Sequence, residues 1–267
     1  MTAEVPPPVE LEALARRVAS AAGAHALERR RLGVSVSTKS TTTDMVTDAD
    51  RATEVLIVDQ LLDARPDDGI VGEEGGEREG ASGVRWIIDP IDGTTNFVYD
   101  HAAWACSIGV SSGGEMVAGA VYVPPAGELF AAARGHGATL NGTPISPTAE
   151  GDLALALVGT GFTYHAAPRV DQAQVVAALI GEVRDIRRLG SAAVDLCMVA
   201  CGRLDIYYER YLNSWDAAAG ELIAREAGAS TSDWSGAAPT PQRLLAAAPG
   251  IHAALLRLLE HAAPTPA

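Results

Sequence analysis

The chain contains 267 residues, of which 48% are hydrophobic, and carries a formal net charge of −14 at pH 7. A chain of this size can bury a large core, either as one domain or as two tightly joined lobes. The acidic balance argues against nucleic-acid and membrane partners, which need basic patches, but not against a small phosphate ester, because bound divalent cations reverse the local charge of an acidic pocket.

The cysteines and the chain start bear on the cellular compartment. Cys106, Cys197 and Cys201 form no disulfide-scaffold pattern, which is typical of a reducing environment. Cys197 and Cys201 are four residues apart, but nothing completes a zinc set, so we expect them to pack in the core. We see no signal peptide and no apolar run of membrane-spanning length, and therefore predict a soluble cytoplasmic protein.

Hydrophobic periodicity predicts the elements of the first half of the chain. The proline-rich segment 1–8 and the tail 263–267 are expected to be loose. Apolar residues at helical spacing predict amphipathic helices at 9–31 and 52–62. Later segments are a strand at 70–71, a surface loop at 75–83, and antiparallel strands at 107–110, 116–123 and 128–132.

The second half repeats the alternation of helices and sheet. Its predicted elements are a strand at 153–159, a helix at 170–183, a helix that ends near Gly202, a strand at 204–209 and a helix at 217–227. This pattern predicts an α/β (α+β) protein built as a layered α-β-α-β-α sandwich. We divide it into an N-terminal lobe at 9–147 and a C-terminal lobe at 148–262 that together form one catalytic unit.

The most informative stretch runs from Trp86 to Phe97. Residues 86–88 favour a short strand, and the following proline and glycine predict that Asp89 and Asp92 lie on a loop at its end. Both carboxylates and the Ile91 carbonyl can then turn toward one point, and such oxygen ligands suit Mg²⁺ or Mn²⁺. Taken alone, the pair could equally be ordinary turn formers.

Two further motifs favour metal ligands over turn formers. Gly72-Glu73-Glu74 lies upstream, and Trp215-Asp216-Ala217-Ala218-Ala219-Gly220 lies downstream. With Asp89-Pro-Ile-Asp-Gly-Thr-Thr-Asn-Phe97, they occur in the order found in the inositol monophosphatase family, which this chain resembles from about residue 11 to about residue 250. The resemblance implies the same layered fold and a magnesium-dependent, lithium-sensitive phosphatase.

The resemblance also implies a set of metal ligands. Glu73, Asp89 and the Ile91 carbonyl would hold one Mg²⁺, and Asp89, Asp92 and Asp216 a second. A third, weaker ion near Glu73 is implied as well, which gives two to three Mg²⁺ per site, with Mn²⁺ possible. From the residues alone, Asp216 could instead be a plain helix cap.

The resemblance assigns further roles. Asp50 would pair with Thr94 to orient and deprotonate the attacking water beside Glu73, although Asp48 and Asp50 alone read as helix-start residues. Lys39 would lie at the edge of the site. Substrate contacts would come from Asp92, Gly93, Thr94, Ser191, Ala192, Glu209 and Asp216. Helix packing also explains the small residues at 190–193, and a surface charge also explains Glu209.

The predicted reaction is hydrolysis of a small phosphate monoester by metal-activated water, with myo-inositol 1-phosphate as the expected substrate. Histidinol phosphate is the main alternative. Bisphosphate substrates need more basic residues than Arg210 alone, so they are disfavoured. A non-catalytic scaffold that binds RNA polymerase or another protein is the alternative of a different class. The resemblance also implies a homodimer.

Overall fold

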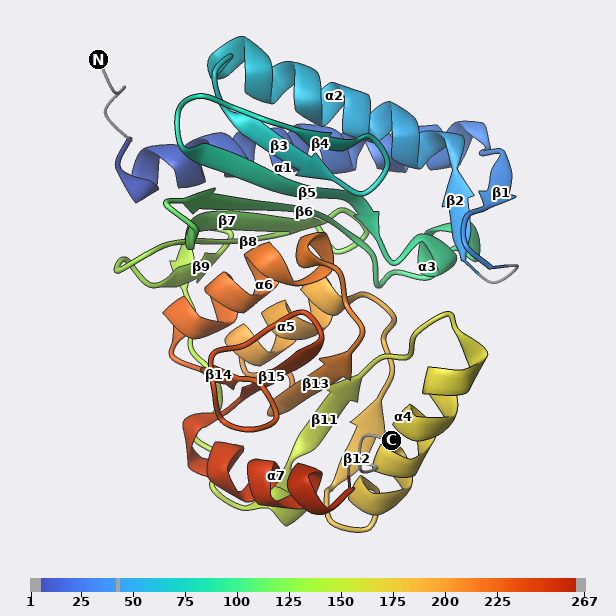
Figure 1. Ribbon diagram of the computed structural model, residues 1–267, viewed down its shortest axis with the longest axis vertical. Coiled ribbons are helices and arrows are strands. Elements are labelled where there is room, and N and C mark those ends of the chain that lie inside the picture. The colour runs from blue at the N-terminus through green and yellow to red at the C-terminus, as the bar shows by residue number, and fades with distance from the viewer. Residues whose placement is uncertain (1–5, 42–43, 263–267) are drawn as a thin grey trace.

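The structure is a computed structural model that describes residues 6–41 and 44–262. Its elements form alternating layers of helices and sheets, stacked along the long axis of the molecule (Figure 1). The layered α-β-α-β-α sandwich predicted from the sequence is therefore confirmed. Within the described residues, no helix combines the length and the hydrophobicity needed to cross a bilayer.

The first sheet has eight strands in the order β10-β9-β8-β7-β6-β5-β3-β4. Only β3 and β5 pair in parallel; the other neighbours are antiparallel. Its strands are β3 (Gly69–Gly72), β4 (Gly76–Arg78), β5 (Val84–Asp92), β6 (Ala105–Ser112), β7 (Glu115–Val123), β8 (Glu128–Ala133), β9 (Ala138–Leu140) and β10 (Thr143–Pro144).

The second sheet has five strands in the order β12-β11-β13-β15-β14. A separate antiparallel ribbon joins β1 and β2. The strands are β11 (Leu157–Thr160), β12 (Asp185–Arg187), β13 (Ile206–Arg210), β14 (Ser230–Ser232) and β15 (Arg243–Ala247), with β1 (Val36–Thr38) and β2 (Met45–Thr47) in the ribbon. The chain passes from the first sheet to the second between β10 and β11, near the predicted lobe boundary.

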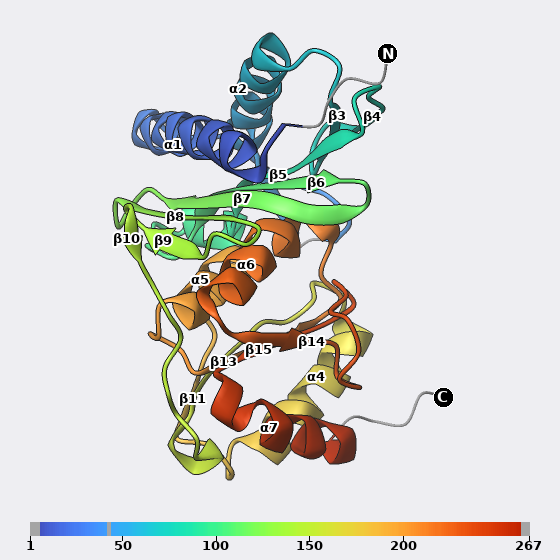
Figure 2. The same cartoon turned by 90° about the vertical axis from the view of Figure 1, so that its left-hand side faces the viewer.

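The helices occupy three layers, as the two views show (Figures 1 and 2). The outer pair on the first sheet is α1 and α2, the middle pair is α5 and α6, and the outer pair on the second sheet is α4 and α7. Their bounds are α1 (Pro8–Leu32), α2 (Asp48–Ala64), α3 (Thr94–Val98), α4 (Ala166–Leu179), α5 (Ala192–Ala200), α6 (Ser214–Ala227) and α7 (Pro249–Ala262).

A hydrophobic core fills each gap between layers. Trp86 and Ile88 of β5 are fully buried against α1 and α2, whereas Tyr207 of β13 packs in the middle core. Its neighbours Ile206 and Tyr208 belong to the outer core with α4 and α7. Because successive side chains of a strand point to opposite faces, β13 contributes to two cores at once.

Four predicted segments differ from the structure. The loop expected at 75–83 contains β4, which pairs with β3. The strand expected at 153–159 is a 3₁₀ turn, Leu153–Leu155, followed by β11. The helix predicted at 170–183 is α4, which begins and ends four residues earlier. Helix α1 already begins at Pro8, within the segment expected to be loose, because proline suits the first helical position. The other residues that were expected to be loose include 1–5 and 263–267, which lie outside the described part of the chain.

The placement of Asp89 and Asp92 on a loop is also wrong. Strand β5 continues through both residues, and its pairing with β6 becomes irregular between them. Asp89 faces Ser107 and Asp92 faces Ala105, so three steps of β5 match two steps of β6. This is a β-bulge, in which Pro90 can be accommodated although it donates no ladder hydrogen bond.

The middle helix layer lies very close to the first sheet. A Cβ atom on Gly119 of β7 would lie 3.1 Å from the Cα atom of Ala219 in α6, so the backbones approach without an intervening side chain. The same helix carries Asp216. The distance between α6 and the sheet therefore determines how close Asp216 comes to the end of β5.

We predict that Gly119→Val lowers the free energy of unfolding by about 1–3 kcal/mol, the usual cost of overpacking, because the new side chain must push α6 away from the sheet. Urea denaturation measures this change. Gly181→Val is the matched control, since no neighbouring atom lies within 4 Å of an added Cβ there. An unchanged unfolding free energy for Gly119→Val would contradict the close packing.

Candidate active site

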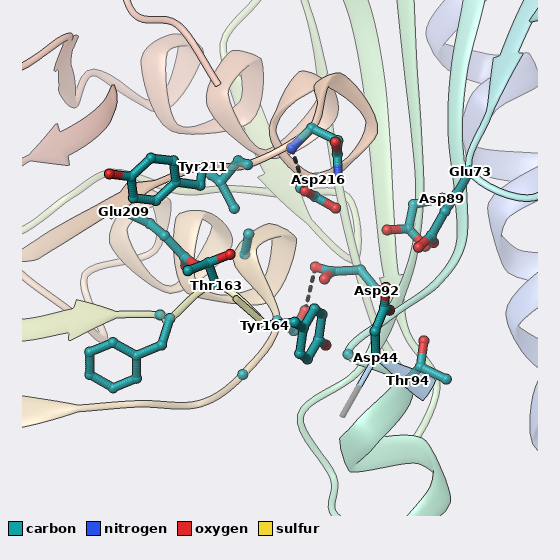
Figure 3. A pocket seen from close by; sticks show the side chains of 18 of the residues that line it. Asp44, Glu73, Asp89, Asp92, Thr94, Thr163, Tyr164, Glu209, Tyr211 and Asp216 are labelled. Atoms are coloured by element: carbon teal, nitrogen blue, oxygen red, sulfur yellow. Dashed lines mark hydrogen bonds between the residues drawn. The ribbon is translucent and has the colours of Figure 1, made fainter. Parts of the chain in front are cut away.

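A cavity of about 450 Å³ lies between the first sheet and the second half of the chain, and Figure 3 shows the side chains that line it. Nearly every predicted site residue is brought to it. Those that line it are Lys39, Glu73, Asp89, Ile91, Asp92, Gly93, Thr94, Ser191, Ala192, Glu209 and Asp216. The exception is Asp50, which lies behind Thr94 and contacts the site through it.

Three carboxylates form the centre of the site. Asp89, Asp92 and Asp216 each offer one oxygen, and the three oxygens lie within 4.8 Å of one another. Figure 3 shows them pointing toward one region from β5 and from the first turn of α6. Asp89 and Asp92 are only 1% and 7% exposed. The site therefore concentrates negative charge where water screens it poorly.

Hydrogen bonds fix two of these carboxylates from the second half of the chain. Asp92 accepts the Ser191 hydroxyl at 2.6 Å and the Ala193 N–H at 2.7 Å, both at the start of α5. Asp216 accepts the N–H of Asn213 at 2.6 Å within the capping box of α6. Ser191, expected as a substrate contact, thus already uses its hydroxyl to orient Asp92, and Asp216 is a helix-capping residue as well as a cluster member.

The pKa values of the cluster reflect this crowding. Burial, and then the neighbouring carboxylates, raise the pKa of Asp89 well above its usual range. The pKa of Asp216 is raised in the same way, by burial and by Asp92. Burial raises the pKa of Asp92 to about 6 although the bonds from Ser191 and Ala193 oppose it, and burial raises that of Glu73 to about 7. Such a cluster needs a compensating cation.

The donor set fits Mg²⁺ or Mn²⁺. Hard divalent cations prefer carboxylate and carbonyl oxygens, and the cavity presents such donors: Glu73, Asp89, Asp92, Asp216 and the Ile91 carbonyl. The raised pKa values give the physical reason, because a bound cation would relieve the repulsion that now favours protonation.

The predicted pairing of Asp50 with Thr94 is present. The Thr94 hydroxyl lies 3.2 Å from Asp50 Oδ1 and 3.1 Å from the Ile91 carbonyl oxygen, so it can donate to either. Asp50 is fully buried, and its Oδ2 accepts the N–H of Thr47 at 2.8 Å. The same contact closes the capping box of α2. Asp50 therefore both completes the capping box of α2 and contacts Thr94 at the site.

Lys39 lies at the edge of the site, as expected. Its Nζ atom is 2.8 Å from Glu73 Oε1 and also pairs with Glu74. Burial alone would lower the pKa of Lys39, but the two carboxylates outweigh burial and raise it. This lysine supplies a positive charge beside Glu73. None of the ion pairs in the described part of the chain includes Asp89, Asp92 or Asp216, although the charge of Arg188 lowers the pKa of Asp92.

The far wall of the cavity comes from β13 and from the segment after β11. Glu209 lies there, across the cavity from Asp89 (Figure 3). Its Oε2 accepts the Tyr207 hydroxyl at 2.6 Å. Burial raises the pKa of Glu209 to about 7. The sequence analysis missed other lining residues because they belong to loops without a local motif: Asp44, Thr163, Tyr164, Arg188 and Tyr211.

Comparison with known proteins places this geometry in a family. Residues 8–264 match the model of the inositol monophosphatase family. The chain belongs to that family. Magnesium-dependent hydrolysis of phosphate monoesters is the family's general reaction, so the prediction of a phosphoric monoester hydrolase is confirmed.

Individual relatives agree with the family match. The inositol-1-monophosphatase SuhB of Mycobacterium tuberculosis is 45% identical over 276 residues, covering 95% of this chain and 94% of the relative. The Nus factor SuhB of Escherichia coli is 44% identical over 195 residues, covering 72% of this chain and 73% of that protein. The crystal structure of the suppressor protein SuhB from Bartonella henselae superposes with a TM-score of 0.90 at 36% identity, covering 94% of this chain and 98% of that chain.

We predict that Asp89→Asn stabilises the metal-free protein at neutral pH by about 1 kcal/mol, because it removes a buried charge from a repulsive cluster. The amide oxygen can still accept the Ile91 N–H, which lies 3.0 Å from Asp89 Oδ1. Thermal unfolding with and without Mg²⁺ measures the effect. The variant should lose the stabilisation that Mg²⁺ gives to wild type; a variant less stable than metal-free wild type would contradict the argument.

The raised pKa values also predict a pH dependence. The folded cluster binds protons more tightly than the unfolded chain does, so the metal-free protein loses stability as the pH rises. The loss begins near about pH 4, the usual carboxyl pKa in the unfolded chain, and continues through the folded-state pKa values of about 6 for Asp92 and about 7 for Glu73. Protons compete with Mg²⁺ for the same oxygens. The rise in melting temperature on adding Mg²⁺ should therefore be larger at about pH 7.5 than at about pH 5.5. An equal rise at both values would count against the cluster as the binding site.

Proposed function

We propose that this protein hydrolyses myo-inositol 1-phosphate to inositol and phosphate in a magnesium-dependent reaction. One observation carries the proposal: carboxylates from both halves of the chain converge within 4.8 Å in a cavity of about 450 Å³. That arrangement suits Mg²⁺ together with an anionic ligand. The inositol-1-monophosphatase name of the mycobacterial relative supports the choice of substrate.

In this proposal the site holds two to three Mg²⁺ ions, which Mn²⁺ can replace. Their ligands are Glu73, Asp89, Asp92, Asp216 and the Ile91 carbonyl. The chemistry supplied by bound Mg²⁺ is neutralisation of phosphate charge and activation of water. The family likeness supports the ligand roles, and the closeness of the aspartate oxygens supports a shared site.

The residues around Thr94 are proposed to orient the nucleophile. The Thr94 hydroxyl donates to Asp50, which leaves the threonine oxygen free to accept a hydrogen bond from the attacking water. Asp50 can take up a proton along this path, and burial raises its pKa, which favours that role. The N–H groups of Gly93 and Thr94 are proposed to hold the phosphate beside the metal ligands.

The leaving group is proposed to lie against Glu209. Its Oε2 is held by Tyr207, and the carboxylate lines the cavity. A carboxylate that accepts hydroxyl hydrogen bonds favours a neutral polyol. The small residue Ala192 also lines the cavity. Histidinol phosphate stays the alternative substrate, because its cationic amine would also suit this acidic wall.

A non-catalytic role is the second candidate, and one observation favours it: the Escherichia coli relative is named a Nus factor. We therefore keep binding to another macromolecule as a possible additional role of this chain. The converging carboxylates favour catalysis, since a purely structural scaffold has no need to bury repelling charges. Lithium sensitivity, a homodimer and a cytoplasmic location remain predictions from the family resemblance and the sequence.

The first test is phosphate release from myo-inositol 1-phosphate and from histidinol phosphate with Mg²⁺. We expect the inositol ester to be preferred, and Asp50→Asn and Thr94→Ala to lower kcat by about 10²–10⁴-fold, the range for loss of a positioned acid or base. Asp92→Asn serves as the blank. Metal-dependent release from neither ester would favour the non-catalytic candidate, whereas a preference for histidinol phosphate would overturn only the substrate.

Glu209→Gln tests the substrate contact separately. The amide retains the size of the side chain but is a weaker acceptor for a polyol hydroxyl, so we expect KM for myo-inositol 1-phosphate to rise about tenfold, with kcat changed less. A small ester such as phosphoglycolate, which has no ring hydroxyls, is the control substrate. If both substrates are affected equally, Glu209 acts on the metal site or on folding and not on the leaving group.

A further inference from the structure

The turn that carries Glu73 rests on the buried carboxylate of Glu54. Glu54 belongs to α2, one helical turn after Asp50, and is 4% exposed. Residues four apart lie on the same helix face, so α2 points both carboxylates toward the first sheet. Asp50 reaches Thr94, whereas Glu54 reaches the segment between β3 and β4.

Glu54 holds two consecutive backbone groups of that segment. Its Oε2 accepts the N–H of Glu74 at 2.9 Å, and its Oε1 accepts the N–H of Gly75. Hydrogen bonds to a carboxylate are stronger than those between neutral groups. A single side chain thus fixes the two peptide units that directly follow Glu73.

The fit between this turn and the carboxylate is close on both sides. A Cβ atom on Gly72 would lie 2.8 Å from the carboxylate carbon of Glu54, and one on Gly75 would lie 2.6 Å from Oε1. The two glycines that flank Glu73 and Glu74 therefore leave the space that Glu54 occupies. The Gly-Glu-Glu-Gly sequence of the turn and the glutamate of α2 form one packing unit.

Stability alone does not account for this arrangement. Burial is the largest cause that raises the pKa of Glu54. The hydrogen bonds from Glu74 and Gly75 and the charge of Lys39 oppose this rise but do not cancel it. Among the ion pairs of the described residues, none includes Glu54. A buried carboxylate without a paired cation is costly, so its position indicates a role in the neighbouring site.

A second buried carboxylate shows the contrast. Asp68 is 1% exposed, pairs with Arg65 and accepts the Trp86 indole N–H at 2.8 Å and the Ser82 hydroxyl at 2.6 Å. Like Glu54, it does not line the cavity, but its partners belong to the core and to loops away from the cavity. Asp68 has the features of a structural carboxylate, whereas the side-chain hydrogen bonds of Glu54 within the described residues go to the turn next to a site residue.

We propose that Glu54 is a positioning residue that holds the Glu73 turn in its metal-binding arrangement. Loss of Glu54 then weakens Mg²⁺ binding through Glu73, while the substrate contacts across the cavity stay intact. The inference rests on the proposed role of Glu73 as a metal ligand. Residues that orient a ligand from behind typically contribute about 10–100-fold to metal affinity.

The test is Mg²⁺ binding to Glu54→Gln, measured by titration calorimetry on the substrate-free protein and as the Mg²⁺ midpoint of phosphate release. We expect binding to weaken about 10–100-fold, with kcat largely restored at saturating Mg²⁺ and KM for the ester unchanged. Two controls remove a charge elsewhere in the same lobe. Asp59→Asn changes a residue on the exposed side of α2. Asp68→Asn changes a buried carboxylate, and we expect it to lower the melting temperature without shifting the Mg²⁺ midpoint.

A second variant perturbs the same contact with Glu54 kept. Gly72→Ala places a methyl group at the position of the carboxylate, so it should displace Glu54 and reproduce the Mg²⁺ defect. In a Glu54→Ala background, which provides space for that methyl group, Gly72→Ala should add little, because both changes remove one interaction. Fully additive defects would contradict a shared mechanism.

The outcomes separate this inference from the proposed function. If wild type binds no Mg²⁺, or if Glu73→Gln leaves binding unchanged, both the metal role of Glu73 and the inference fail. If Glu73→Gln abolishes binding but Glu54→Gln binds Mg²⁺ as wild type does and only melts earlier, Glu54 is structural and the inference alone is overturned.

Discussion

The constraint on which the whole structure depends is the burial of like charges at one point. Asp89 and Asp92 lie on β5 and Asp216 lies on α6. The repulsion between their carboxylates therefore acts between two layers of the fold and not only within one loop. Two hydrophobic cores hold these layers together on either side of the first sheet. Local destabilisation at a site, offset by packing elsewhere, is the usual pattern where a fold is organised for ligand binding.

The same constraint explains why the two halves of the chain depend on each other. Asp92 belongs to the first sheet, yet its hydrogen bonds come from Ser191 and Ala193 at the start of α5. Asn96 of the same motif likewise donates to the Leu189 carbonyl at 2.7 Å. Asp92 is therefore oriented from across the cavity, and neither half of the chain contains all three aspartates of the cluster.

Short-range patterns in the sequence predicted the layers, and the resemblance of three motifs to a known family predicted most of the site. The error at Asp89 and Asp92 has a tertiary cause: Pro90 and Gly93 are local signals of a loop, but pairing with β6 extends the strand through a bulge. Tyr164 and Tyr211 could not be found, because they reach the cavity from loops whose course is set by distant contacts. Glu54 was missed for the same reason, since its partners lie twenty or more residues away.

Asp50 and Asp216 show that a structural and a functional interpretation of one residue need not exclude each other. Each is the third residue of a helix and completes a capping box, and each also faces the cavity or its threonine. A capping carboxylate is held by backbone N–H groups, so its position is fixed before any ligand arrives. A residue that must present an oxygen at a defined point gains from that restraint, because less conformational entropy is lost on binding. Helix capping is therefore a means by which this fold orders its site in advance.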